Sequence, residues 1–142
     1  MVGTLTDTYV AALQHDLADV PADATPVGVV RKPTPWFYGV VEENLPALGP
    51  PETLLDSTKQ AATDLEMRGI CEEEAHNAAW DVVGFEDRYR ANLAESNDAA
   101  TATDDLIDRL DAGESIALVC YENTAKKRCH RTILREAIRD RL

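Results

Sequence analysis

Long apolar runs are missing from this sequence of 142 residues, and the uninterrupted hydrophobic stretches are only a few residues long. A membrane-spanning helix needs about 20 consecutive apolar residues, so the sequence predicts no transmembrane segment and no membrane partner. The first ten residues, MVGTLTDTYV, also lack the basic start and the apolar stretch of a secretory signal peptide. We therefore expect a cytoplasmic protein.

Cysteine is scarce, with three residues in the chain. Three cysteines cannot all pair with one another, and the reducing cytoplasm favours free thiols. Paired Cys-x-x-Cys knuckles are absent, as are a P-loop and a Gly-x-Gly-x-x-Gly fingerprint. A phosphatase loop would need Arg six residues after its cysteine, whereas Lys126 stands six residues after Cys120. These absences leave no nucleotide cofactor to predict.

Basic residues are few: four Lys and ten Arg stand against 26 acids, and the net charge is -12. Such an acidic surface stays hydrated in concentrated salt, where screening removes the repulsion between carboxylates. The composition is typical of a halophilic protein, and we expect an archaeal source. The alternative is an acidic surface matched to a basic partner. Either interpretation argues against binding to duplex DNA, whose phosphates would be repelled.

The charge is also uneven along the chain. The first 119 residues carry 23 acids and seven bases, a net charge of -16, whereas residues 120–142 carry a net charge of +4. The bases of this final segment are Lys126, Lys127, Arg128, Arg131, Arg135, Arg139 and Arg141. A local positive region in a negative field focuses a small anion rather than a long polyanion.

Hydrophobic periodicity predicts helices that alternate with short strands. The predicted helices are Thr4–Val20, Glu52–Arg68, Cys71–Val83, Phe85–Leu93, one that begins near Thr101 and ends at Gly113, and a final amphipathic helix from about Cys129. The polar segment AESNDAAT is expected to be a loop, and the predicted strands are Pro26–Arg31, Trp36–Val41 and Ser115–Cys120. The sequence therefore predicts one α/β domain over residues 1–142, with three layers and a short, mainly parallel sheet.

The segment VCYENTAKKRCHRTILREAI has the layout of a ligand site, because ligands bind beyond the carboxyl ends of parallel strands. Cys120 ends a strand, a loop follows, and a helix begins near Cys129. The free N–H groups of that helix would favour a phosphate, sulfate or carboxylate beside Arg128 and Arg131, and they would also lower the pKa of the Cys129 thiol. His130 could act as a general base or as an anion ligand.

Two arginines are expected to meet in this pocket. Arg31 follows one predicted strand and Arg131 lies in the helix after another, and parallel strands end on one edge of the sheet. Buried Arg needs an acidic partner, and the carboxylate of Glu122 is the nearest candidate by sequence. Cys120 and Cys129 should also lie close together, and Cα atoms separated by about 4.4–6.8 Å would permit a disulfide.

Structural alternatives remain open for the same residues. Cys120 could be a small buried hydrophobic residue of its strand. The arginines 131, 135 and 139 could form an ordinary solvated stripe on the helix. A zinc site is not predicted, since the sequence lacks cysteine knuckles and the neighbouring Cys129 and His130 rarely reach one ion together.

The quoted residues resemble a known family, domain of unknown function 488. Its members carry a strand that leads into Cys-x-Glu and a later Cys-His-Arg that opens the last helix, and ALVCYENTAKKRCHRTIL matches this pattern at Cys120, Glu122 and residues 129–131. The strand VGVVRKP is similar to the family's Asp-Val-Arg strand, with Arg31 retained and Val29 in place of Asp. The family's opening strand has no clear counterpart in MVGTLTDTYV. The resemblance implies an α/β fold and a pocket lined by these residues, without a known activity.

The sequence thus leads to a ligand-binding hypothesis. We expect a pocket for a small anionic ligand, one that carries phosphate, with thiol chemistry at Cys129 or Cys120 assisted by His130, and with Arg31, Glu122, Arg128 and Arg131 as binding residues. The alternative is a non-catalytic binding or regulatory module whose cysteines are structural. The pattern predicts no metal and no cofactor, and it leaves the oligomeric state open.

Overall fold

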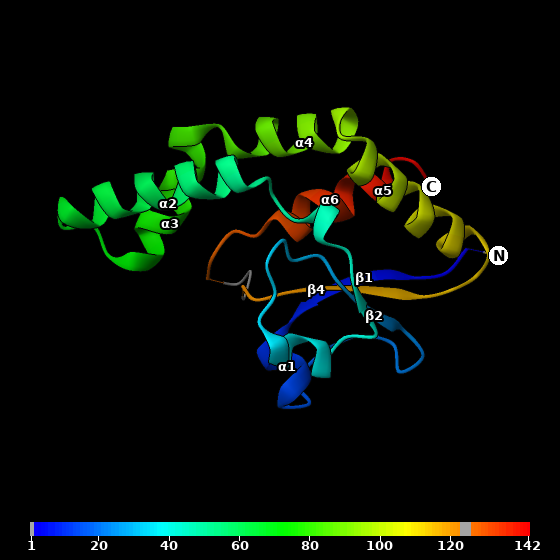
Figure 1. The fold of residues 1–142 in the computed structure, drawn as a ribbon. Coiled ribbons are helices and arrows are strands. Elements are labelled where there is room, and N and C mark those ends of the chain that lie inside the picture. The colour runs from blue at the N-terminus through cyan, green and yellow to red at the C-terminus, as the bar shows by residue number, and fades with distance from the viewer. Residues whose placement is uncertain (1, 123–125) are drawn as a thin grey trace.

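A parallel four-stranded sheet with strand order β1-β4-β2-β3 forms the centre of the computed structural model, which describes residues 2–122 and 126–142 (Figure 1). The strands are β1 (Leu5–Tyr9), β2 (Thr25–Gly28), β3 (Glu43–Asn44) and β4 (Ile116–Cys120). All five residues of β4 are buried, and β4 pairs with β1 on one side and β2 on the other. A continuous apolar strand is what a central parallel position requires. The predicted α/β fold is confirmed.

Helices cover the two faces of the sheet unequally. The helices are α1 (Val10–Gln14), α2 (Glu52–Met67), α3 (Glu72–Val83), α4 (Phe85–Glu95), α5 (Asn97–Asp111) and α6 (His130–Arg139), with 3-10 turns η1 (Pro35–Gly39) and η2 (Pro46–Leu48). Figure 1 shows α2 to α6 on one side of the sheet and α1 on the other. Among the described residues, no helix is long and apolar enough to cross a membrane.

The N-terminal segment differs from the prediction, because the expected helix Thr4–Val20 is wrong. Residues Leu5–Tyr9 form β1, which pairs in parallel with β4 from Leu5 opposite Ile116 to Tyr9 opposite Cys120. The threonines of this stretch favour an extended backbone, and pairing with β4 satisfies its polar groups. The segment MVGTLTDTYV therefore does contain a strand, and it places Asp7 in the sheet.

The segment after β2 also differs from the prediction. The expected strand Trp36–Val41 is largely the 3-10 turn η1, with Pro35 at its start and Phe37 fully buried. The edge strand is the short β3 instead. Its Asn44 side chain accepts a hydrogen bond from the Val30 N–H at 3.0 Å and donates one to the Val30 carbonyl at 2.9 Å. This side-chain clamp fixes the backbone directly before Arg31.

The remaining helices follow the hydrophobic pattern closely. The structure confirms α2, α3, α4 and α6 within a few residues of the predicted ends. Helix α5 begins earlier than predicted, because Ser96 caps it by accepting a hydrogen bond from the Ala99 N–H at 3.3 Å. Most of the predicted loop AESNDAAT is therefore helical.

Candidate functional site

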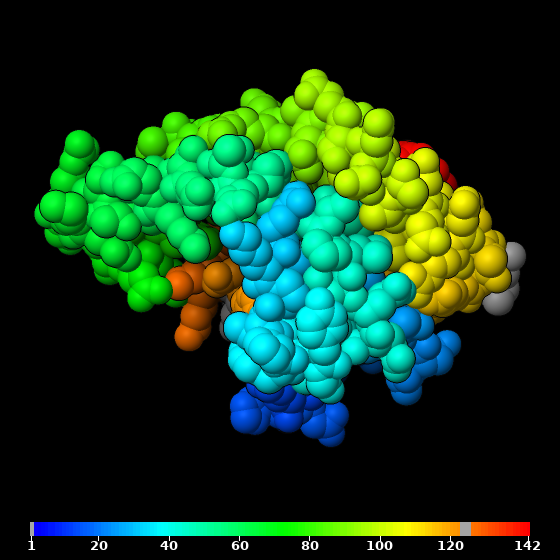
Figure 2. All heavy atoms as spheres, in the orientation of Figure 1, coloured from blue at the N-terminus to red at the C-terminus, as the bar shows by residue number. Residues whose placement is uncertain are grey.

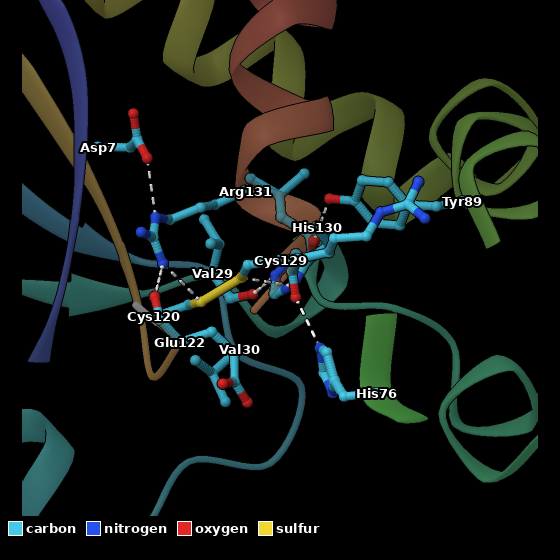
Figure 3. The surroundings of a disulfide bond; sticks show 12 residues. Asp7, Val29, Val30, His76, Tyr89, Cys120, Glu122, Cys129, His130 and Arg131 are labelled. Carbon is cyan, nitrogen blue, oxygen red and sulfur yellow. Dashed lines mark hydrogen bonds and ion pairs between the residues drawn. A yellow bond between two sulfur atoms is a disulfide. The ribbon is translucent and has the colours of Figure 1, made fainter. Parts of the chain in front are cut away.

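Cys120 and Cys129 form a disulfide that joins the end of β4 to the start of α6 (Figure 3). Both residues are buried, with 3% and 4% of their surface exposed, whereas Cys71 is a free and exposed thiol. The two Cα atoms are 7.9 Å apart, somewhat beyond the expected range. The expectation of free thiols is wrong for this pair, because the strand end and the helix N-cap bring the two sulfurs together across a loop.

Arg131 lies buried beside the disulfide, with 2% of its side chain exposed. Its Nε donates to Asp7 Oδ2 at 2.9 Å, and its Nη1 donates to Cys120 Sγ at 3.3 Å and to the main-chain carbonyl of Glu122. Burial lowers the pKa of Arg131, and the hydrogen bond that Arg131 donates to Asp7 opposes that shift. The Asp7 carboxylate also pairs with Arg135.

Among the described residues, the carboxylate that pairs with Arg131 is therefore that of Asp7, whereas the sequence predicted Glu122 as its acidic partner. Glu122 contributes its backbone carbonyl instead. Asp7 was missed because its segment was assigned to a helix, which would have kept it away from the sheet edge. The alternative that Arg131 belongs to a solvated arginine stripe is also wrong, because Arg131 is buried and only the later arginines of α6 reach solvent.

His130 is the first residue of α6, and both of its ring nitrogens have neighbours. Nε2 lies 2.6 Å from the Val29 carbonyl oxygen, which can only accept, so Nε2 carries the proton. Nδ1 lies 3.6 Å from Cys129 Sγ. Burial lowers the pKa of His130 to about 4, although the hydrogen bond to Val29 opposes the shift. The ring is therefore neutral near pH 7, with the Nδ1 lone pair on the side of the sulfurs.

Side chains of helix α3 form hydrogen bonds with the backbone of Arg128, directly before α6. His76 Nε2 lies 2.8 Å from the Arg128 carbonyl oxygen, and the Asn77 side chain accepts a hydrogen bond from the Arg128 N–H at 2.9 Å. The Arg128 guanidinium lies over the Trp80 ring, 4.9 Å from its centre, and pairs with Asp81 at 3.0 Å. The sequence did not predict these contacts of His76 and Asn77, because their partner lies about fifty positions away.

A cavity of about 360 Å³ opens beside the disulfide. Its polar lining includes Arg31, Lys32, Lys59, Arg128, His76 and Glu122, and its wall also contains both cysteines, His130, Trp80 and Phe85. In Figure 2, the orange atoms of the segment before α6 lie between the green surface of the α2–α3 hairpin and the light-blue surface of the segment after β2. Five other predicted site residues therefore line the same cavity as Arg31.

Arg31 and Arg131 occupy different positions around this cavity. Arg31 lines it and donates to the carbonyls of Gly49 at 2.9 Å and Pro50 at 3.1 Å. Arg131 is not part of the lining and contacts the site through Cys120. The expected convergence of both guanidinium groups on one cavity is therefore wrong, because the Asp7 carboxylate draws Arg131 towards β1.

One family model matches residues 15–142, and its description is "DUF488-N3a: Active DUF488-N3 subclade". The chain belongs to the DUF488 family. The matched range covers nine-tenths of the chain and includes every site residue predicted from the sequence, while Asp7 precedes it. No curated protein and no solved structure matches the chain.

In this DUF488 protein, residues from four separate segments lie around the disulfide or line the cavity beside it. β1 contributes Asp7, the segment after β2 contributes Arg31, β4 contributes Cys120, and α6 begins with His130 and Arg131. The parallel sheet explains this arrangement, because β1, β2 and β4 all end on the same edge. The site is thus held by regular secondary structure on both sides of residues 121–129.

Proposed function

We propose that the cavity binds a small anionic ligand that carries a phosphate group, next to a cysteine pair with thiol chemistry. The lining has four cationic side chains and one carboxylate, that of Glu122, although the whole chain has a net charge of -12. This reversal of charge is the observation that carries the proposal. A positive cavity within a negative surface concentrates small anions and repels extended polyanions.

Arg31 is the leading ligand-binding residue. Carbonyl oxygens of Gly49 and Pro50 hold its guanidinium in place without neutralising its charge. Within the described residues, no carboxylate pairs with Arg31 or with Lys59. By contrast, Lys32 pairs with Glu52 and Arg128 pairs with Asp81. Two of the four cations are therefore available to an incoming phosphate, which arginine binds with directional hydrogen bonds.

The rest of the wall suits an organic phosphate better than a bare ion. Leu55, Ala62, Trp80 and Phe85 contribute apolar surface, and the volume of about 360 Å³ lies within the range of small-molecule sites. The N-terminus of α6 lies at the wall as well, because its N-cap Cys129 and first residue His130 both line the cavity. The positive end of the helix dipole adds to the attraction for a phosphate.

The cysteine pair supports thiol chemistry in its reduced state. The Arg131 guanidinium would then stabilise a Cys120 thiolate, and the neutral Nδ1 of His130 would accept the proton of the Cys129 thiol. When the pair returns to the disulfide, two thiols lose two protons and two electrons, which an oxidised ligand or another disulfide takes up. For the cytoplasm, which we keep as the proposed compartment, lasting disulfides are uncommon and usually have catalytic or redox-sensing roles.

The second candidate is a binding module in which the disulfide is structural. The burial of both sulfurs and the link between β4 and α6 favour it. The two candidates share the anion cavity and differ in whether the cysteines react.

Anion binding is tested by calorimetric titration with inorganic phosphate and with a nucleoside monophosphate, at constant ionic strength. We expect Arg31→Ala and Lys59→Ala each to weaken binding about tenfold, the effect of losing one hydrogen bond to a charged group. Arg88→Ala serves as the control, because Arg88 is an exposed arginine of α4 outside the cavity. Equal affinities in all four proteins, or no binding by the unmutated chain, would remove the proposed ligand site.

A further inference from the structure

We infer that reduction of the disulfide creates a zinc site from Cys120, Cys129 and His130. One ligand atom from each of these residues lies within 4.8 Å of the other two, and all three residues are buried. This inference does not depend on the proposed anion ligand, since it uses the sulfurs and the imidazole rather than the cations of the cavity.

The distance between neighbouring ligand atoms fits a tetrahedral ion. With zinc–sulfur bonds of about 2.3 Å and zinc–nitrogen bonds of about 2.0–2.1 Å, a tetrahedral angle places sulfur and nitrogen about 3.5 Å apart. Cys129 Sγ and His130 Nδ1 are 3.6 Å apart. The sequence argued against zinc because adjacent Cys and His rarely reach one ion. Here the helix start turns both side chains to the same side (Figure 3).

The residues behind these ligands have the arrangement that zinc sites use. A ligating histidine usually donates its second ring N–H to a carbonyl or carboxylate, which fixes the ring and leaves the other nitrogen for the metal. His130 Nε2 has such a partner in the Val29 carbonyl at 2.6 Å. Arg131 donates to Cys120 Sγ, so it would offset the negative charge of a bound thiolate. Asp7 holds this guanidinium in position.

Two thiolates and one imidazole leave a fourth position open. Sites with three protein ligands and one exchangeable position are typical of catalytic zinc, and sulfur with imidazole favours zinc over magnesium or calcium. All three ligands line the cavity, so the open position would face it. A water molecule or an oxygen of a bound anion could complete the tetrahedron.

Zinc and the disulfide exclude each other. Reduction of the disulfide by a dithiol or a phosphine adds two electrons and two protons and gives two thiols. Zinc then displaces both thiol protons as it binds. Oxidation of the two sulfurs removes two electrons and releases the ion. The site would therefore bind metal only under reducing conditions.

The test is a titration of the reduced protein with Co²⁺, which reports tetrahedral thiolate ligation by its absorption, followed by displacement with Zn²⁺. We expect one equivalent to bind with sulfur-to-cobalt and tetrahedral bands, and no such bands in the disulfide form. Cys120→Ser and Cys129→Ser should lose the bands, and His130→Gln, which keeps a donor for Val29 but lacks Nδ1, should weaken binding about 10–100-fold. Cys71→Ser is the matched control and should bind as the unmutated protein does.

Absence of these bands in the reduced, unmutated protein would overturn the zinc site, as would bands that depend on Cys71. Circular dichroism shows whether each variant keeps the fold, and the disulfide form of the unmutated protein serves as a folded reference that lacks the metal ligands. Phosphate titration of the same samples keeps the two proposals apart, because the phosphate affinity depends on Arg31 and Lys59 and the cobalt bands depend on the sulfurs.

Discussion

Asp7 is the residue on which the buried side of the site depends most. Its carboxylate is 12% exposed and pairs with Arg131, whose side chain is 2% exposed, and also with Arg135. A buried ion pair gains little over an apolar pair, but removal of one partner leaves an uncompensated charge in a poorly solvated place. Removal of the Asp7 carboxylate should therefore destabilise the fold by more than the ion pair itself contributes to stability.

We expect Asp7→Asn to lower the free energy of unfolding by about 3–5 kcal/mol, the usual cost of breaking a buried ion pair. Asp104→Asn is the matched control, since Asp104 pairs with Arg141 while both side chains are more than half exposed. Its effect should be about 1 kcal/mol or less. Urea unfolding of the variants measures both values. Equal losses for the two substitutions would contradict the assignment of Asp7 as a buried counter-ion.

Glu122→Ala should lower the free energy of unfolding less than Asp7→Asn does, because Arg131 donates to the backbone carbonyl of Glu122, which the substitution leaves in place.

The secondary-structure elements differ in how far the sequence could predict them. Strand β4 and helices α2, α3, α4 and α6 have apolar patterns that fit one structure each, and they were predicted within a few residues. Around β1, the residues Leu5, Tyr9 and Leu13 fit a helical spacing, and only the pairing of Leu5–Tyr9 with β4 shows that this stretch is a strand. Such pairing depends on residues more than a hundred positions away.

The same reasoning applies to the candidate site. Cys120, Cys129, His130 and Arg31 could be selected because they follow strands or open a helix, and the structure places them on one cavity. The partner of Arg131 could not be selected in this way. Asp7 lies 124 positions away, and only the pairing of β1 with β4 brings it next to Arg131. The closeness of Cys120 and Cys129 was predicted from their places at a strand end and a helix start, whereas their default state was expected to be free thiols because the proposed compartment is reducing.

Arg109 links three elements near the far end of the sheet. Arg109 lies in α5 and donates hydrogen bonds to Glu114 at 2.7 Å and to Glu43 of β3. Hydrogen bonding to Arg109 lowers the pKa of Glu114, and burial partly opposes this shift. A carboxyl group with a lower pKa in the folded state adds stability above its unfolded pKa, near 4.5, and that stability is lost as the pH falls through the folded pKa.

We therefore expect Glu114→Gln to be less stable than the unmutated protein by about 1 kcal/mol at pH 7, since the pair is partly solvated. The difference should shrink as the pH falls below the unfolded pKa and through the lowered pKa of Glu114, because the Glu114 side chain then becomes neutral. Urea midpoints between pH 3 and pH 7 measure this dependence, and Glu95→Gln, at an exposed position of α4, is the control. A difference that stays constant with pH would show that the ionised carboxylate does not stabilise these elements.

For the whole molecule, the net charge of -12 is the dominant property. Twenty-six acids on one small chain repel one another in dilute buffer, and counter-ions screen this repulsion within about 10 Å at 0.1 M salt and about 3 Å at 1 M. The cavity cations lie within this negative field, so both the stability and the ligand affinity depend on salt.

We predict that the melting temperature rises as KCl is increased from dilute buffer to molar concentrations, because screening reduces the repulsion among the acids. Thermal denaturation followed by circular dichroism measures it, and a sugar at matched osmolality controls for general exclusion effects. An unchanged or lower melting temperature in molar KCl would contradict the halophilic interpretation.

The most direct test of the proposed site measures how fast each cysteine of the reduced, metal-free protein reacts with iodoacetamide, with and without phosphate at constant ionic strength. Mass spectrometry separates Cys120 from the exposed Cys71. Because Arg131 contacts Cys120 Sγ and the cavity gives access to it, we predict that Cys120 reacts faster than Cys71 near neutral pH. We also predict that phosphate slows Cys120 alone. A Cys120 that reacts no faster than Cys71, at a rate that phosphate does not change, would contradict an anion-binding thiol site.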